Sequence, residues 1–416
     1  MTSYPPRPDD PTAGLVVVGG GPAGHSAAAS YRKHGGAGRV VIISADGDAP
    51  YQRPPLSKDF LRGESEETAL PMESADFYRE NETELWLADS VIGLDLTSNS
   101  VTTAANRAVT FESCVLATGN EPTTLPVPGG DHPEVLRLRF LQQARILRRA
   151  ASQARSAVIV GSGFIGCEAA ASLAARGLDV VVLSMEELPQ LGRLGRSAAE
   201  RVAGWLADAD VRMLGEVEVS HIFDGRIVRT EQGDFEADVI LTAAGVKPRT
   251  ELAERAGLAV QNGRIVVDER MGTAAPGVFA AGDVALAYHP TAGRRLRVEH
   301  WGEALRMGEV AGANAAGVDD RWTEVPGFWS EIGHRTVKYA AWGDGFDRDD
   351  LVDHGDGAFT VWYSRAGRVV GVLTHDADHD HDRGQELVAA GATLDGATLD
   401  GRRAIGRRAN GRVGWW

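Results

Sequence analysis

Two glycine-rich turns contain the residues with the clearest chemistry in this sequence. Residues 19–24 (GGGPAG) and 161–166 (GSGFIG) both have the spacing G-x-G-x-x-G. Each turn follows a short apolar run and opens a segment of small residues at helical spacing. In that setting the first glycine makes a tight turn, the second lets the backbone approach a pyrophosphate, and the third lets the helix pack closely on the strand. The pattern therefore predicts two dinucleotide sites in one chain.

The segments around both turns predict the elements that must position them. Each turn joins a buried strand to a helix that leads to a second strand, which is the β-α-β order of a Rossmann unit. The first unit is expected to place its elements at 15–18, 25–34 and 40–43, and the second at 157–160, from the turn to 177, and at 180–183. The chain is therefore expected to contain two Rossmann-like halves.

An acidic residue after the second strand of each unit would bind the ribose hydroxyls of the nucleotide. Asp46 fits this role in the first unit. The second unit continues with Ser184, Met185 and Glu186, which leaves two possibilities. Either Glu186 binds the ribose hydroxyls, or Ser184 leaves room for a 2′-phosphate. No arginine follows Ser184 directly, so NADH is slightly favoured over NADPH.

Composition excludes several classes of protein. The 416 residues carry 43 Lys and Arg against 58 Asp and Glu, and the net charge of −15 argues against a nucleic-acid partner. Cys114 and Cys167 are the two cysteines, so there is no CxxC redox or zinc motif, and Cys167 is interpreted as a packing residue. No apolar run reaches the roughly 18 residues of a membrane span, and the first residues lack the apolar core of a signal peptide. We expect a cytoplasmic protein that binds no membrane.

The rest of the chain is expected to be rich in β-structure. Short β-like pieces at 85–118 are typical of a meander, and apolar runs at 239–241 and 278–280 would return the chain to parallel sheets. From Trp322 onward, alternating β-branched and aromatic residues predict an antiparallel domain. The run 374–382 (THDADHDHD) has imidazoles and carboxylates that could bind a divalent ion, but a solvated acidic loop is favoured over a metal site.

Two dinucleotide sites in one chain suggest that one nucleotide delivers hydride to the other. FAD with NAD(P)H is the usual pair, and a flavin converts two-electron into one-electron transfer. Disulfide reductases provide a cysteine pair beside the flavin, and this sequence has none. The electrons are therefore expected to leave to an external partner.

Further motifs resemble those of the FAD-dependent ferredoxin and rubredoxin reductases, the family of putidaredoxin reductase and apoptosis-inducing factor within the pyridine nucleotide-disulfide oxidoreductase superfamily. The resemblance extends from about residue 14 to 390, in matching order and spacing. It rests on the segments 51–58 (YQRPPLSK), 116–119 (LATG), 163–168 (GFIGCE), 280–285 (AAGDVA), 297–301 (RVEHW) and 328–330 (FWS).

The resemblance implies roles for individual residues. Lys58 would reach the N5 edge of the flavin and pair with Glu168, and Trp329 would stack where the nicotinamide binds, so these three are the expected catalytic residues. Asp283 would accept hydrogen bonds from the ribityl hydroxyls. The residues expected to bind the two nucleotides are Gly19, Gly21, Pro22, Ala23, Gly24, Asp46, Arg53, Lys58, Val91, Thr118, Gly119, Gly282, Asp283, Glu299, His300, Trp301, Trp329, Gly161, Gly163, Phe164, Ile165, Gly166, Ser184, Glu186 and Gly245.

The expected fold is α/β, with two Rossmann-like domains for FAD and NAD(P) and a C-terminal α+β domain that contains an antiparallel sheet. The FAD domain is expected to be discontinuous, and the Arg-rich end of the chain to be a flexible tail. The expected boundaries are 12–119 with 243–320 for FAD, 120–242 for NAD(P), 321–390 for the C-terminal domain and 391–416 for the tail.

The expected activity is transfer of electrons from NAD(P)H through FAD to a ferredoxin-like iron–sulfur protein, by a monomer or homodimer. One alternative is a flavoenzyme of the same fold that acts directly on a small molecule in a biosynthetic pathway. A second is a redox-sensing flavoprotein that binds NADH and changes its partners. An NAD(P)H oxidase or peroxidase is disfavoured because residues 51–58 occupy the region where those enzymes have a redox cysteine. Arginines at 145, 148, 149, 294, 295 and 297 could supply a docking patch for the acceptor.

Overall fold

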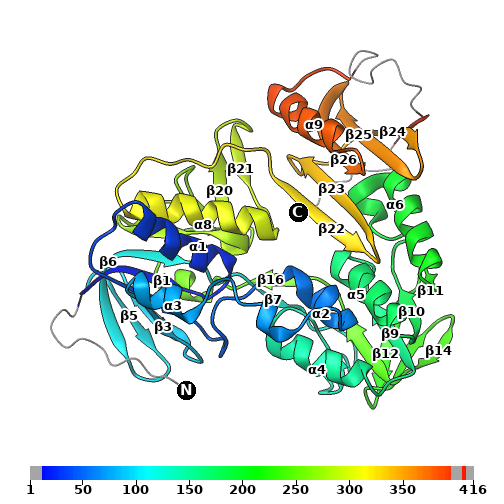
Figure 1. The fold of residues 1–416 in the computed structure, drawn as a ribbon, viewed down its shortest axis with the longest axis horizontal. Coiled ribbons are helices and arrows are strands. Elements are labelled where there is room, and N and C mark those ends of the chain that lie inside the picture. The colour runs from blue at the N-terminus through cyan, green and yellow to red at the C-terminus, as the bar shows by residue number, and fades with distance from the viewer. Residues whose placement is uncertain (1–11, 395–404, 409–416) are drawn as a thin grey trace. The chain divides into compact units, whose positions relative to one another are not determined.

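The computed structural model describes residues 12–394 and 405–408, and the chain forms two compact units (Figure 1). The first unit contains the described residues up to 52, together with 70–121 and 247–324. The second contains 53–69, 122–246 and the described residues from 325 onward. The domain boundaries expected from the sequence stay a prediction.

The main sheet of the first unit has the glycine turn 19–24 at the end of its central strand β1. Strand β1 runs parallel to β2 on one side and to β6 on the other, so that Val17 pairs with Ile42 and Val115, all three buried. The predicted return of 278–280 to this sheet is confirmed, because β19 pairs in parallel with β6. The sheet order is β3-β2-β1-β6-β5-β4, with bounds β1 (Thr12–Val18), β2 (Arg39–Ile43), β3 (Thr83–Trp86), β4 (Val91–Asp95), β5 (Ser100–Thr103), β6 (Ala108–Leu116) and β19 (Val278–Ala280).

Helix α1 (Pro22–Lys33), which follows the turn, packs tightly on α8 (Trp301–Ala315), as Figure 1 shows in blue and yellow. Two glycines on α8 permit the close approach. A Cβ atom on Gly308 would lie 2.3 Å from the Ala23 carbonyl oxygen, and one on Gly312 would lie 2.1 Å from that of Ala27. The backbones of the two helices are therefore in direct contact, which fixes the start of α1.

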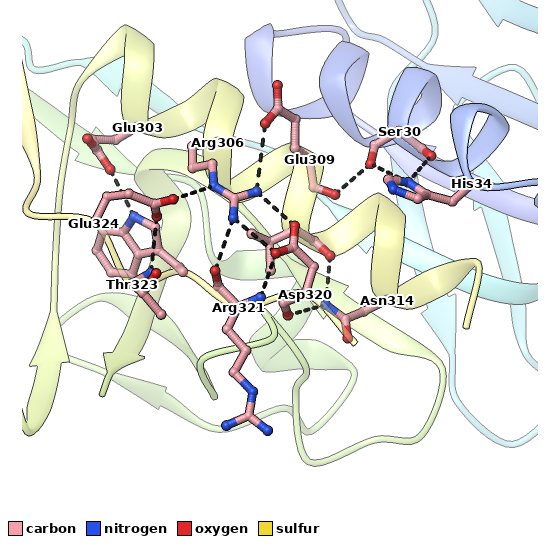
Figure 2. A network of polar contacts seen from close by, with 12 residues as sticks. Ser30, His34, Glu303, Arg306, Glu309, Asn314, Asp320, Arg321, Thr323 and Glu324 are labelled. Carbon is pink, nitrogen blue, oxygen red and sulfur yellow. Dashed lines mark hydrogen bonds and ion pairs between the residues drawn. The ribbon is translucent and has the colours of Figure 1, made fainter. Parts of the chain in front are cut away.

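Arg306 on α8 anchors the segment that ends the first unit (Figure 2). Its guanidinium donates to both carboxylate oxygens of Asp320, at 2.8 and 3.0 Å. These hydrogen bonds raise the pKa of Arg306 above its usual value. One turn further along α8, the Glu309 carbonyl accepts the Ser30 hydroxyl at 2.7 Å, which joins α1 to α8. The helix pair that supports the glycine turn is thus held by polar contacts as well as by packing.

The first unit also contains a second sheet, in the order β17-β18-β20-β21, and several short helices. In this sheet β18 is parallel to β20, and β20 is antiparallel to β21. The bounds are α3 (Ala75–Glu80), α7 (Glu251–Arg255), β17 (Val260–Gln261), β18 (Arg264–Val267), η3 (Gly282–Val284), β20 (Ala285–His289) and β21 (Arg294–Leu296). The chain passes between the units within β7 (Asn120–Pro122) and β16 (Val246–Pro248).

The second unit contains the other Rossmann sheet, in the order β11-β10-β9-β15-β8, with all its pairs parallel. Val158 on the central strand pairs with Val181 and Ile240, and all three are buried. The bounds of this sheet, its helices and the hairpin beside it are β8 (Val135–Leu136), α4 (Leu141–Ala151), β9 (Ser156–Val160), α5 (Phe164–Ala175), β10 (Asp179–Leu183), α6 (Leu191–Asp208), β11 (Val211–Leu214), β12 (Val219–Phe223), β13 (Ile227–Thr230), β14 (Gly233–Glu236) and β15 (Val239–Thr242).

The predicted antiparallel sheet after Trp322 is confirmed, and it belongs to the second unit. Its order is β22-β23-β26-β25-β24-β27. The unit also contains the short helices that follow the YQRPP segment. The bounds are η1 (Pro54–Ser57), α2 (Asp59–Arg62), η2 (Glu67–Ala69), β22 (Gly327–Ile332), β23 (Arg335–Ala341), β24 (Arg348–Gly355), β25 (Ala358–Arg365), β26 (Arg368–His375), α9 (Asp378–Ala390) and β27 (Ile405–Arg408).

Two expectations about the C-terminal region differ from the structure. The solvated acidic loop predicted at 374–382 is wrong, because β26 extends to His375 and α9 begins at Asp378. The Thr360 hydroxyl donates to Asp380 at 2.7 Å, and Gly384 lets the helix approach Val372, so tertiary contacts stabilise the helix. Residues 405–408, expected in the mobile tail, form β27 beside β24, while the rest of the tail from 395 lies outside the described residues. In the part of the chain that is described, no helix is long and apolar enough to cross a membrane.

Candidate functional site

The turn at 19–24 has a backbone that requires glycine. Gly19 has φ +122°, and a Cβ atom on it would lie 2.1 Å from the Ala117 carbonyl oxygen. A Cβ atom on Gly24 would lie 1.9 Å from the Gly19 carbonyl oxygen. Helix α1 begins at Pro22, with Gly21 as a cap that has no side chain to occupy the first N–H groups. Such a helix start presents N–H donors and a positive dipole to an anion such as a pyrophosphate.

The acid predicted to bind the ribose of the first nucleotide forms hydrogen bonds with neighbouring protein residues. Asp46 accepts a hydrogen bond from the Tyr51 hydroxyl at 2.7 Å through Oδ2. Its backbone N–H donates to Ser44 Oγ at 3.1 Å, which fixes the loop after β2. Because Tyr51 opens the YQRPP segment, that segment helps to position the acid.

The predicted Thr118-Gly119 turn lies next to an unsatisfied amide. Thr118 donates its hydroxyl to the Arg249 carbonyl at 2.7 Å, and Gly119 has φ +63°. The next residue, Asn120, is 1% exposed, and neither atom of its amide has a hydrogen-bond partner among the described residues. Buried amides are nearly always hydrogen-bonded. A polar ligand at this turn, as FAD would be, fits the donors and acceptors present.

The other residues expected to bind FAD in the first unit include a buried acid with an unpredicted partner. Asp283 is buried in η3 after Gly282, and its carbonyl accepts a hydrogen bond from Arg264 Nε at 3.1 Å. Arg264 is itself buried and forms an ion pair with Glu299. Arg264 therefore holds two predicted site residues, although nothing in its sequence context identified it.

The remaining predicted residues of the first unit stand at the ends of elements. His300 precedes α8 as its N-cap, and Trp301 is the first residue of that helix. Val91 begins β4 and pairs with Thr103 in β5. Backbone groups at such positions are available to a ligand more often than those in the middle of an element.

The turn at 161–166 repeats the geometry of the first turn. Gly161 has φ +111°, and a Cβ atom on it would lie 2.5 Å from the Ala243 carbonyl oxygen. A Cβ atom on Gly166 would lie 2.1 Å from the Gly161 carbonyl oxygen. Gly163 is the N-cap of α5, and the first residues of that helix, Phe164 and Ile165, are partly exposed. The second unit therefore has a turn of the same geometry, with the same N–H donors for an anion at the start of its helix.

The hydroxyl of Ser184, in the loop after β10, contacts other groups of the protein. Ser184 Oγ lies 2.7 Å from Ser162 Oγ, and both side chains are buried. It also accepts the Glu186 N–H at 3.1 Å. Glu186 in turn accepts the Gly192 N–H at 2.7 Å through Oε1. The Ser184 hydroxyl thus has two partners within the protein. Glu186 is the carboxylate next to the end of the strand.

Lys58 and Glu168 form the buried ion pair that the resemblance implied. Lys58 Nζ lies 2.7 Å from Glu168 Oε2, and the two side chains are 6% and 4% exposed. The same carboxylate accepts the Ser57 hydroxyl at 2.5 Å and, through Oε1, the Ser330 hydroxyl at 2.7 Å. The buried charge of Glu168, which would otherwise be costly, is therefore satisfied by three donors. They are Ser57 in η1, Lys58 directly after it and Ser330 in β22. Ser57 and Ser330 lie within the recognised motifs, but no role was predicted for them.

An exposed aromatic side chain lies over this ion pair. The ring of Trp329 is centred 5.0 Å from Lys58 Nζ, which is within the range of a cation–π contact. Trp329 is 46% exposed, unlike most large apolar residues of the chain. A Trp with one face on a charged pair and the other open can stack on a planar ligand.

Two further predicted residues of the second unit lie apart from the ion pair. The guanidinium of Arg53, which precedes η1, lies 5.3 Å from the ring centroid of Phe140. Gly245 is exposed, has φ +100° and accepts the Thr123 N–H at 2.9 Å through its carbonyl.

Both cysteines are free and buried. Burial raises the pKa of the Cys114 thiol to about 12 and holds that of Cys167 above its usual value. Cys167 donates its thiol to the Ser162 carbonyl at 3.3 Å. A thiol protonated at neutral pH is a poor nucleophile, so the interpretation of Cys167 as a packing residue agrees with its surroundings.

The fold is that of a two-Rossmann-domain oxidoreductase, in which two sheets each contain a parallel strand pair joined through a glycine turn and a helix. The chain belongs to the pyridine nucleotide-disulphide oxidoreductase family, whose profile matches residues 13–308. It is therefore an oxidoreductase.

Individual relatives cover nearly the whole chain. The rhodocoxin reductase of Rhodococcus erythropolis is 31% identical over 91% of this chain and 90% of its own length. The probable ferredoxin reductase CtmF of Castellaniella defragrans is 33% identical over 91% of this chain and 94% of its own length. Among solved structures, the reductase in a covalent putidaredoxin reductase–putidaredoxin complex matches with a TM-score of 0.86 and 27% identity, over 92% of this chain and 95% of that one.

Proposed function

We propose that this protein oxidises NAD(P)H and passes the electrons through FAD to an iron–sulfur protein of the ferredoxin or rubredoxin type, in the cytoplasm. The observation that carries the proposal is the buried pair of Lys58 and Glu168 beneath the exposed ring of Trp329. Relatives named as ferredoxin and rubredoxin reductases that align with most of the chain support the same acceptor class.

The first unit would bind FAD and the second NAD(P)H, each at its glycine turn. FAD, when bound, accepts a hydride and releases its electrons one at a time. The residues of this chain then bind and orient the reactants. Trp329 offers an open ring face to a nicotinamide, and Lys58 provides a fixed positive charge that favours a reactant gaining negative charge. Glu168, held by Ser57 and Ser330, keeps that lysine in place.

The acceptor is proposed to be an external protein because the chain has no redox cysteine available. Its two cysteines are buried, and their thiols are kept protonated by burial. Two of the arginines that could form a docking patch are paired with acids of the same unit. Arg145 pairs with Glu67 at 2.5 Å, and Arg148 with Glu66 at 3.4 Å. We therefore propose no patch built on those two.

NADH is the proposed coenzyme. The hydroxyl of Ser184 lies 2.7 Å from Ser162 Oγ and accepts the Glu186 N–H, so a 2′-phosphate would have to compete with these two partners for it. Glu186 places a negative charge beside the end of the strand, where it would accept hydrogen bonds from a ribose and repel a phosphate. We expect Glu186→Gln to weaken NADH binding about 10-fold and to narrow the preference for NADH over NADPH. Titration of the oxidised holoprotein with NAD⁺ and NADP⁺ measures both, and an unchanged ratio of the two dissociation constants would reject the assignment.

One experiment tests the proposed function as a whole. The purified holoprotein is reduced anaerobically with NADH or NADPH while the flavin absorbance is followed. Cytochrome c is then added with and without a panel of ferredoxins and rubredoxins. Cytochrome reduction that depends on one of the iron–sulfur proteins is the expected result. Rapid turnover of a small organic substrate with no iron–sulfur protein able to accept electrons would contradict it.

A further inference from the structure

The loop between β10 and α6 contains a buried amide that the protein does not satisfy. Gln190 is 5% exposed, and its Nε2 has no hydrogen-bond partner within residues 12–394 and 405–408. A buried donor without an acceptor is destabilising, and such groups usually meet a ligand or a bound water. The backbone of Gln190 is also left-handed, with φ 59° and ψ 19°, which is uncommon for a residue other than glycine. Something other than local stability therefore keeps this side chain in place.

The unsatisfied amide points at the second glycine of the turn 161–166. A Cβ atom built on Gly163 would lie 4.0 Å from Gln190 Nε2. Apart from the chain neighbours of Gly163 and the backbone of α5, no other described atom would lie that close. Gly163 is the N-cap of the twelve-residue helix α5 and has no side chain to cap the first N–H groups. The amide nitrogen therefore lies close to the start of the helix.

The loop that carries Gln190 is held in position from both ends. The Gln190 carbonyl accepts the N–H groups of Arg193 and Leu194, at 3.0 and 2.8 Å. Two residues along the chain, the Gly192 N–H donates to Glu186 at 2.7 Å. A donor fixed before the ligand arrives loses little conformational entropy on binding. The geometry is that of a prepared ligand contact.

We propose that Gln190 binds the pyrophosphate of the nicotinamide coenzyme by donating an Nε2 hydrogen to a phosphate oxygen. This inference rests on the proposed function, which assigns NAD(P)H to the turn 161–166. A ligand that satisfies both groups must accept hydrogen bonds, because the amide nitrogen and the first N–H groups of α5 are all donors. A phosphate oxygen meets that requirement at the glycine where the backbone approaches a pyrophosphate most closely.

The test compares Gln190→Ala with wild type by calorimetric titration of the FAD-loaded protein with ADP-ribose, which retains the pyrophosphate. Loss of one hydrogen bond to a charged group predicts binding weaker by about 10-fold or more. Adenosine lacks phosphate, so its dissociation constant for Gln190→Ala, measured by competition, should lie within about two-fold of that for wild type. Two-fold is about the scatter of such measurements. Gln153→Ala, which removes an exposed glutamine of the same unit, is the matched control and should leave both ligands unaffected. FAD content and the far-UV spectrum verify the fold.

A second variant separates a bond to phosphate from packing. Gln190→Glu has nearly the same size but replaces the donor by a carboxylate. We expect it to weaken ADP-ribose binding more than Gln190→Ala does, and to do so increasingly as the pH rises through the titration of the new acid. ADP-ribose binding within two-fold of wild type in both variants would overturn the inference while leaving the proposed function intact. A wild-type protein that binds neither ADP-ribose nor NADH would overturn both.

Discussion

The turn at 19–24 in the first unit and the turn at 161–166 in the second use the same backbone device. The first N–H of each turn donates to the last carbonyl of the neighbouring strand, Gly19 to Ile43 at 2.8 Å and Gly161 to Leu183 at 2.9 Å. In both, the third glycine packs on the carbonyl of the first. After each second strand, a serine hydroxyl accepts the N–H two residues on, at 3.1 Å in both cases.

The helices that follow these turns differ in the residues they bury. After its third glycine, α1 has His25 and Ser26, whereas α5 has Cys167 and Glu168, and all four are buried. His25 contacts the Tyr78 hydroxyl at 3.1 Å, and burial lowers its pKa to about 4, so it is neutral at pH 7. Glu168 forms the ion pair with Lys58. The glycine turn therefore provides the same backbone geometry in both units, while the next helical residues determine whether the unit also holds a buried charge.

The largest expected effects come from breaking one turn at a time. Gly24→Ala should lose nearly all bound FAD, because its Cβ atom would lie 1.9 Å from the Gly19 carbonyl oxygen. Gly166→Ala faces a similar clash at 2.1 Å but should keep FAD and bind NADH about 10- to 100-fold more weakly, as overpacking of about 1–3 kcal/mol implies. Flavin absorbance after gel filtration and titration with NAD⁺ measure the two losses. Loss of FAD from the Gly166 variant alone would show that the turns are assigned to the wrong nucleotides.

Removing the charge that distinguishes the second unit should have the next largest effect. Lys58→Met leaves Glu168 buried without its cation, which costs about 3–5 kcal/mol of unfolding free energy. We expect reduction of the flavin by NADH to slow about 100-fold. Stopped-flow absorbance gives the rate, and Lys58→Met combined with Glu168→Gln should recover stability without recovering the rate. Ser330→Ala, which removes a single donor to the carboxylate, is the milder control. A wild-type rate in Lys58→Met would end the proposed role of the ion pair.

The smallest effect concerns the neutral histidine of the first unit. Because the pKa of His25 falls from 6.5 to about 4 on folding, the unfolded chain binds the extra proton in that interval. Stability therefore decreases as the pH falls from 6.5 towards 4, by about 2 kcal/mol between pH 7 and pH 5 from this group. Urea unfolding of wild type and His25→Gln at both pH values measures the difference. An equal loss of stability in the two proteins would mean that His25 is not the group responsible.

Short residue patterns predicted those parts of the fold that depend on local backbone geometry. The turn at 19–24 and the strands beside it follow from glycine spacing and apolar runs, and they lie where they were expected. The acidic run at 374–382 shows the limit of such patterns. Its alternating charges indicate a loop, yet the bond from Thr360 to Asp380 and the packing of Gly384 on Val372 place most of it in a helix.

The two glycine turns follow from the amino-acid sequence alone, because a φ value that favours glycine and the order of strand, turn and helix are local properties. The partners of the buried charges, in contrast, depend on the tertiary structure. Glu168 meets Lys58 across 110 positions and Ser330 across 162, and Arg264 meets Glu299 across 35. Gln190 likewise lies over Gly163 only in the folded chain. These contacts depend on how distant segments pack, because a buried charge or amide takes whichever donor or acceptor the fold brings within reach.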